Sequence, residues 1–152
     1  MKYDRIIFAG NDNICRSVMA EAVFRQLYRK YDDKPEIMSR GLAVLFEEPY
    51  NPKAMLTLKM HGIEISEGIS VKLSAEELCE GTLVLTMGFA EKLRIIEDYE
   101  YTEEVYTLKE FVGNDDELLD PYGEELDIYE ACYQDIYEVI EQVVKKLNEE
   151  DI

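Results

Sequence analysis

The chain has 152 residues, 47% of them hydrophobic, which suits a single domain with one core over residues 1–152. Its 34 acidic residues outnumber 16 basic ones, and the formal net charge of -18 argues against nucleic acid and anionic membranes as partners. No apolar run approaches the roughly 20 residues of a membrane span, and the N-terminal residues lack a signal-peptide core, so we expect a cytoplasmic protein.

The first predicted element is a buried strand over residues 3–9, rich in β-branched and aromatic residues. A polar loop over residues 10–16 leads into a helix, in which apolar side chains recur at helical spacing. They are Met19, Val23, Phe24, Leu27 and Tyr31. This order of strand, loop and helix is typical of a βα unit.

Further elements alternate in the same way along the chain. We predict a strand over residues 36–42 and a helix over residues 51–62, which has Pro52 in its first turn and Gly62 at its end. Strands over 81–87 and 105–108 follow, and the last 25 or so residues carry the apolar stripe of an amphipathic helix. The alternation predicts a single-domain α/β fold, a doubly wound parallel sheet of about four strands with flanking helices.

The three cysteines give a separate constraint. Cys15, Cys79 and Cys132 have no metal-ligand spacing, and an odd number without an export signal is typical of reduced thiols. We therefore expect no metal, no other cofactor and no disulfide framework.

The loop over residues 10–16 is the first candidate site. In a parallel sheet, ligands lie at the carboxyl ends of the strands, where backbone N–H groups at a helix start favour an anion. Arg16 adds a guanidinium that can contact two oxygens of phosphate or sulfate. A simple βα connection with capping residues has the same pattern, so the loop alone does not establish a site.

Two short motifs extend the interpretation. The segment N-I-C-R-S-x-M-A-E at 13–21 and the segment D-P-Y-G at 120–123 resemble the low-molecular-weight protein tyrosine phosphatases, a family that also contains protein arginine phosphatases and arsenate reductases. Residues 47–66 resemble the family's Pro-rich loop and following helix, and the C-terminal third is also similar. The resemblance covers nearly the whole sequence.

The resemblance implies a role for each residue of the motifs. It implies that the phosphoryl group is held by Asn11, Asp12, Asn13, Ile14, Cys15 and Arg16. Ser17 would support this loop, Asp120 would be the general acid that protonates the leaving group, and Tyr122 would belong to the substrate pocket. In the family a cysteine ending the first strand attacks phosphorus, and the arginine follows after five residues. That position here is Gly10, which has no thiol.

Other positions also depart from the family's pattern. Gly68 lies near the place where the family often has a histidine, and Leu42 stands where a hydroxyl is usual. Asp12 replaces a loop glycine and adds a negative charge that weakens phosphate binding unless it points to solvent. Cys15 resembles the family's second loop cysteine, and here it would be a lone thiol polarised by Arg16 and the helix start.

Three interpretations of the function follow. The first is a catalytically inactive pseudophosphatase that binds phosphate or a phosphorylated protein side chain; Ile14, which is typical of the family's tyrosine phosphatases, favours phosphotyrosine over phosphoarginine. The second is an enzyme, in which Gly10 replaces a cysteine of the native protein or water attacks with help from Asp120. The third is an interaction scaffold with a vestigial pocket.

Overall fold

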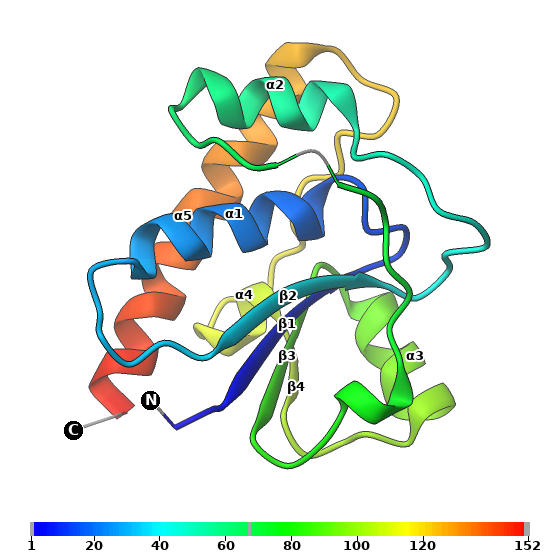
Figure 1. The fold of residues 1–152 in the computed structure, drawn as a ribbon, viewed down its shortest axis with the longest axis vertical. Coiled ribbons are helices and arrows are strands. Elements are labelled where there is room, and N and C mark those ends of the chain that lie inside the picture. The colour runs from blue at the N-terminus through cyan, green and yellow to red at the C-terminus, as the bar shows by residue number, and fades with distance from the viewer. Residues whose placement is uncertain (1, 67, 151–152) are drawn as a thin grey trace.

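A four-stranded sheet forms the centre of the molecule (Figure 1). The computed structural model describes residues 2–66 and 68–150. The strands are β1 (Arg5–Gly10), β2 (Glu36–Gly41), β3 (Thr82–Thr86) and β4 (Val105–Thr107), and their order in the sheet is β2-β1-β3-β4. All three strand pairs are parallel. The predicted α/β fold with a parallel sheet of about four strands is confirmed.

Helices cover both faces of this sheet (Figure 1). One face carries α1 (Arg16–Tyr28), α2 (Pro52–Met60), α4 (Leu108–Phe111) and α5 (Leu126–Glu150). The other face carries α3 (Phe89–Tyr99), and the short 3-10 helix η1 (Ala75–Glu77) lies near its edge. The sheet is therefore the middle layer of three, as in doubly wound proteins.

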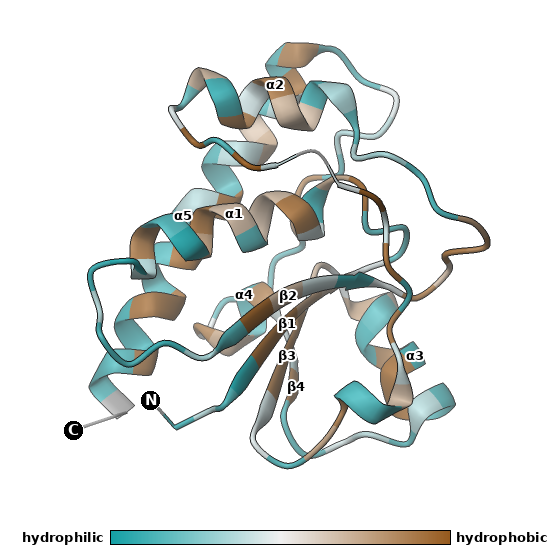
Figure 2. Ribbon diagram, in the orientation of Figure 1, coloured by the Kyte–Doolittle hydropathy of each residue, from teal (hydrophilic) through white to brown (hydrophobic). Residues whose placement is uncertain are grey.

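Side chains of β1 alternate between two apolar clusters. Ile6 and Phe8 belong to the larger cluster, beneath α1 and α5, whereas Ile7 and Ala9 belong to a smaller cluster with Ile95 of α3. The four are completely buried, and Figure 2 shows this strand as largely hydrophobic. A strand that is buried on both faces has a continuous run of apolar residues, and this run is why β1 could be predicted from the sequence.

The helix predicted over residues 51–62 illustrates how local signals set its ends. The Asn51 side chain accepts hydrogen bonds from two backbone N–H groups, at 2.9 Å from Lys53 and 3.1 Å from Ala54, and Pro52 begins the helix. The helix ends at Met60, and Gly62 adopts a positive φ of 75°, a conformation that favours glycine.

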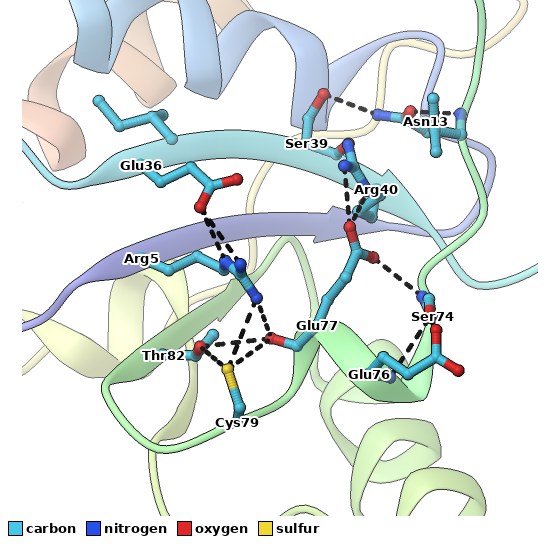
Figure 3. Close-up of polar contacts among 12 residues, drawn as sticks. Arg5, Asn13, Glu36, Ser39, Arg40, Ser74, Glu76, Glu77, Cys79 and Thr82 are labelled. Carbon is cyan, nitrogen blue, oxygen red and sulfur yellow. Dashed lines mark hydrogen bonds and ion pairs between the residues drawn. The ribbon is translucent and has the colours of Figure 1, made fainter.

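An arginine network fastens the segment around η1 to the edge of the sheet (Figure 3). Arg40 of β2 forms an ion pair with Glu77 at 2.8 Å, and Arg5 of β1 donates a hydrogen bond to the Glu77 carbonyl at 2.9 Å. Among residues 2–66 and 68–150, no helix has both the length and the apolar character that crossing a membrane requires.

Candidate functional site

A pocket of about 480 Å³ opens where the first strand meets the first helix. It is lined by Gly10, Asn11, Asp12, Ile14, Cys15, Arg16, Ser17, Glu48, Met87, Asp120 and Tyr122. The carboxyl ends of β1 and β3, the start of α1 and the loops before α2 and α5 all contribute to its wall. Nine of the ten residues proposed for the site from the sequence thus line one pocket, and Asn13 is the exception.

Asn13 is turned into the protein interior and holds the loop in shape. Its side chain donates hydrogen bonds to Ser39 Oγ at 2.9 Å and Ser17 Oγ at 3.1 Å, and accepts one from the Val71 N–H at 2.8 Å. Figure 3 shows the side chain directed towards Ser39. Asn13 also adopts a left-handed backbone with φ of 58°, which asparagine tolerates better than most residues. Its side chain is therefore a scaffold of the loop and is not available to a ligand.

Gly10 is the last residue of β1 and faces the start of α1. A Cβ atom added at Gly10 would lie 3.3 Å from Ser17 Oγ and 3.6 Å from Met87 Cγ. The contact with Ser17 is tight but requires only a small shift. The Gly10 carbonyl accepts a hydrogen bond from the Leu42 N–H at 3.0 Å, so this position is fixed by the neighbouring loop. A small side chain can be accommodated here.

Arg16 lies at the base of the pocket between two carboxylates. Its Nη2 atom is 3.9 Å from Glu91 Oε1 and 3.9 Å from Asp120 Oδ2. The Nη1 atom donates a long hydrogen bond of 3.5 Å to the Leu118 carbonyl. The Arg16 side chain is only 17% exposed, so its charge is partly shielded from solvent. Its guanidinium thus has two carboxylates nearby and one hydrogen bond, a long one to a backbone carbonyl.

Asp12 supplies a second internal anion. Its carboxylate accepts a hydrogen bond from the Ile14 N–H at 3.2 Å, one of the loop amides expected to face a ligand. Three carboxylates line the pocket, those of Asp12, Glu48 and Asp120, against the single guanidinium of Arg16. A bound oxyanion would therefore meet both favourable donors and repulsive charges.

The prediction that Arg16 and the helix start polarise the Cys15 thiol is wrong. Burial, together with a smaller contribution from the nearby Cys132, raises the pKa of Cys15 to about 12, and the opposing effect of Arg16 is smaller than that of burial. Burial also raises the pKa of Cys132 to about 12. Because the charged form of a thiol is disfavoured away from water, Cys15 is protonated near neutral pH.

Asp120 and Tyr122 form the outer rim. The Asp120 side chain is 62% exposed, and its Oδ1 atom accepts a hydrogen bond from the Tyr122 N–H at 3.1 Å. This arrangement is a common turn in which an aspartate accepts from the backbone two residues on. Tyr122 is 74% exposed, so its ring is free to contact a ligand at the mouth of the pocket.

Four residues near the site were not singled out from the sequence. Glu48 and Met87 line the pocket, Glu91 contacts Arg16, and Arg94 donates a hydrogen bond to Asn11 Oδ1 at 3.1 Å. Met87 follows β3, so the rule that sites lie at carboxyl ends of strands could have located it. The other three are surface-type residues whose positions depend on tertiary packing.

The structure shows what surrounds Leu42 and Gly68, two positions at which the sequence differs from the family's pattern. Leu42 is 4% exposed and belongs to the apolar cluster below α3. A Cβ atom at Gly68 would lie 2.7 Å from the Tyr50 ring, so the ring occupies the space that any side chain at this position would need. In the described stretches, His, Cys, Asp and Glu side chains form no group of three or more suited to holding a metal ion.

The fold and the pocket define a parallel α/β protein with a loop site at the carboxyl end of its first strand. The family model described as "Low molecular weight phosphotyrosine protein phosphatase" matches residues 5–151. The chain therefore belongs to the low-molecular-weight phosphotyrosine protein phosphatase family.

Relatives of two kinds resemble the chain to a similar degree. The protein-arginine-phosphatase of Bacillus subtilis is 31% identical over 147 residues, covering 95% of this chain and 97% of its own. The low molecular weight protein-tyrosine-phosphatase PtpB of Staphylococcus epidermidis is 29% identical over 139 residues, covering 91% and 96%. The crystal structure of a YwlE mutant from Bacillus subtilis aligns with a TM-score of 0.89 at 31% identity, covering 95% of this chain and 98% of that one.

Proposed function

We propose that this chain is a catalytically inactive member of the family, a single domain over residues 1–152 that binds a phosphorylated protein side chain without hydrolysing it. The observation that carries the proposal is Gly10, which ends β1 six positions before Arg16 and lines the pocket. By the family resemblance this is the position of the nucleophilic cysteine. Glycine has no atom that can form a phosphoenzyme.

No neighbouring group is suited to replace the missing nucleophile. Cys15 is protonated near neutral pH because its pKa is about 12, and Ser17 is 1% exposed, with its hydroxyl accepting a hydrogen bond from Asn13. Asp120 could still protonate a leaving oxygen as a general acid, but such catalysis alone contributes typically ~10² to 10⁴-fold. A positioned nucleophile has an effective molarity of ~10⁵ M or more, which this chain lacks.

The remaining groups support anion binding of low affinity. The loop lies at the N-terminus of α1, where backbone N–H groups favour an oxyanion, and Arg16 adds a guanidinium. Asp12, Glu48 and Asp120 oppose this attraction from the pocket wall. We therefore expect dissociation constants for free phosphate in the millimolar range.

Phosphotyrosine is the ligand that we propose. Ile14 and Met87 supply apolar wall next to Arg16, and the exposed Tyr122 ring stands at the rim, where it could pack against an aryl group. Both tyrosine and arginine phosphatases are among the relatives, so this preference is a proposal to be tested directly. The three free cysteines agree with a reducing compartment, and we propose a cytoplasmic location.

A turnover assay tests whether the missing thiol explains inactivity. Hydrolysis of p-nitrophenyl phosphate by the wild-type chain should stay at assay background, and Gly10→Cys should gain partial activity because the position has room for a Cβ atom. The matched control, Gly10→Cys combined with Arg16→Ala, should lose that gain. Robust hydrolysis by the wild-type chain that Arg16→Ala abolishes would contradict the proposal and favour an active phosphatase.

A binding titration tests the ligand. Backbone amide signals of Asn11, Ile14 and Arg16 should shift on addition of a phosphotyrosine peptide, and less on addition of a phosphoarginine peptide of the same sequence. The unphosphorylated peptide is the control. If none of the three amides moves at millimolar phosphopeptide or phosphate, the pocket does not bind the anion, and the scaffold interpretation is favoured.

A further inference from the structure

We propose that Glu91 is an internal counter-anion of Arg16 and that its charge sets how tightly the pocket binds oxyanions. The inference deepens the proposed function, because it concerns the same site. Glu91 Oε1 lies 3.9 Å from Arg16 Nη2, although the two residues are 75 positions apart in sequence. Glu91 does not line the pocket, so it meets Arg16 away from the space that a ligand would fill.

Burial makes Glu91 the stronger of the two carboxylate partners of Arg16. The side chain of Glu91 is 10% exposed, whereas that of Asp120 is 62% exposed at the same 3.9 Å distance. Water and salt screen an exposed ion pair strongly and a half-buried pair much less. The charge of Glu91 is therefore screened less at the guanidinium than the charge of Asp120 is.

The Glu91 carboxyl group stands at the N-terminal end of α3. It lies in the first turn of this helix, three residues after the N-cap Gly88. The N-terminal end of a helix carries a partial positive charge, which stabilises a carboxylate there. Because β3 and β1 are adjacent in the sheet, the start of α3 reaches the start of α1, and the two termini bring acid and base together.

The distance decides which effect of Glu91 prevails. At 3.9 Å the two atoms are too far apart for a hydrogen bond, so Glu91 does little to orient the guanidinium. Its negative charge still cancels part of the attraction that Arg16 offers to an incoming phosphate. Removing the charge while keeping the shape should therefore tighten binding.

The test compares the affinity of inorganic phosphate for the intact chain and three variants, measured by titration of backbone amide signals. Glu91→Gln should lower the dissociation constant about tenfold, the size expected for one poorly screened charge near a bound anion. Glu91→Asp, which keeps the charge, should bind as weakly as the wild type. Glu117→Gln is the matched control, because this substitution removes an equal charge. The exposed Glu117 carboxylate lies against Gly88, on the same side as Glu91.

The Arg16 Nε–Hε signal gives a second measurement, because it reports the guanidinium with no ligand present. Glu91→Gln should shift it, and Glu117→Gln should leave it in place. Unfolding temperatures and amide spectra of all variants establish that each is folded. A variant Glu91→Ala serves if Glu91→Gln does not fold.

The outcomes separate this inference from the proposed function. If Glu91→Gln binds phosphate more tightly than the wild type does and Glu117→Gln does not, the inference is supported. If Glu91→Gln binds phosphate and the wild type does not bind it at all, the inference is still supported, but the proposed function of the native chain is overturned. Equal affinities of wild type and Glu91→Gln overturn the inference and leave the proposed function standing. Equal gains in Glu91→Gln and Glu117→Gln also overturn it, because net charge then explains the effect. Absence of binding in every variant overturns both.

Discussion

Replacement of Asn13 by alanine should destabilise the whole protein, because this side chain joins three separate segments. It bonds Ser39 of β2, Ser17 of α1 and the backbone N–H of Val71, and it is 1% exposed. Asn13→Ala removes three hydrogen bonds and leaves buried polar groups without partners. It also puts alanine at a φ of 58°, in the left-handed region.

The magnitude follows from these contacts. Three hydrogen bonds at about 1 kcal/mol each contribute about 3 kcal/mol, and the left-handed backbone adds about 1 kcal/mol for alanine. We expect a loss of about 4 kcal/mol in the free energy of unfolding. For a domain of this size, such a loss lowers the unfolding temperature by about 8 to 16 °C.

Urea unfolding followed by circular dichroism measures this loss. Asn13→Gly should be about 1 kcal/mol more stable than Asn13→Ala, because glycine lacks the left-handed cost. Asn11→Ala is the matched control, since Asn11 is exposed and accepts one hydrogen bond from Arg94; we expect a change below about 1 kcal/mol. A loss below about 1 kcal/mol for Asn13→Ala would refute the role of its hydrogen bonds in holding the loop.

Three further outcomes are expected at neighbouring positions. Gly41→Ala should lower the free energy of unfolding by about 1 to 3 kcal/mol, because its Cβ atom would lie 2.7 Å from a valine methyl group and 3.0 Å from a backbone atom. Gly10→Ala should lower it less, because the tightest contact of its Cβ atom would be 3.3 Å. Equal losses for the two variants would contradict these packing distances. Alkylation of the folded protein at pH 8 should label the exposed Cys79 but not Cys15, because burial raises the pKa of Cys15 to about 12. Cys15 should be labelled once urea unfolds the chain, and mass spectrometry of peptides measures both reactions. Rapid labelling of Cys15 in the folded protein would contradict this expectation, because it would show an accessible thiolate. Asp12→Gly should tighten phosphate binding several-fold, because it removes a pocket carboxylate and frees the Ile14 N–H that this carboxylate binds. An unchanged affinity in the phosphate titration would show that the Asp12 carboxylate does not oppose the anion.

The sequence predicted the fold and the position of the loop because both depend on short patterns. The apolar run of β1, the Asn-Pro start of α2 and the stripe of α5 each specify one element locally. The strand ends were predicted to within two residues, and the pocket lies at the expected edge of the sheet.

The details of the site depend on contacts between distant residues, which such patterns do not record. Glu91 meets Arg16 only because β3 lies beside β1 in the sheet. The expectation for Cys15 was wrong for the same reason: the residues that bury its thiol come from elsewhere in the chain, and their effect on its pKa exceeds that of the adjacent Arg16. The inward direction of Asn13 was likewise set by partners 26 and 58 residues away.

The hydrogen bond from the Val71 amide to Asn13 makes this distant backbone group a reporter of the pocket. An amide proton held in this way exchanges with deuterium in solvent only when its hydrogen bond breaks. The exchange rate of Val71 therefore measures how often Asn13 and Val71 separate, in the absence of any ligand or turnover. A ligand that rigidifies the loop would slow that exchange at a residue it does not touch.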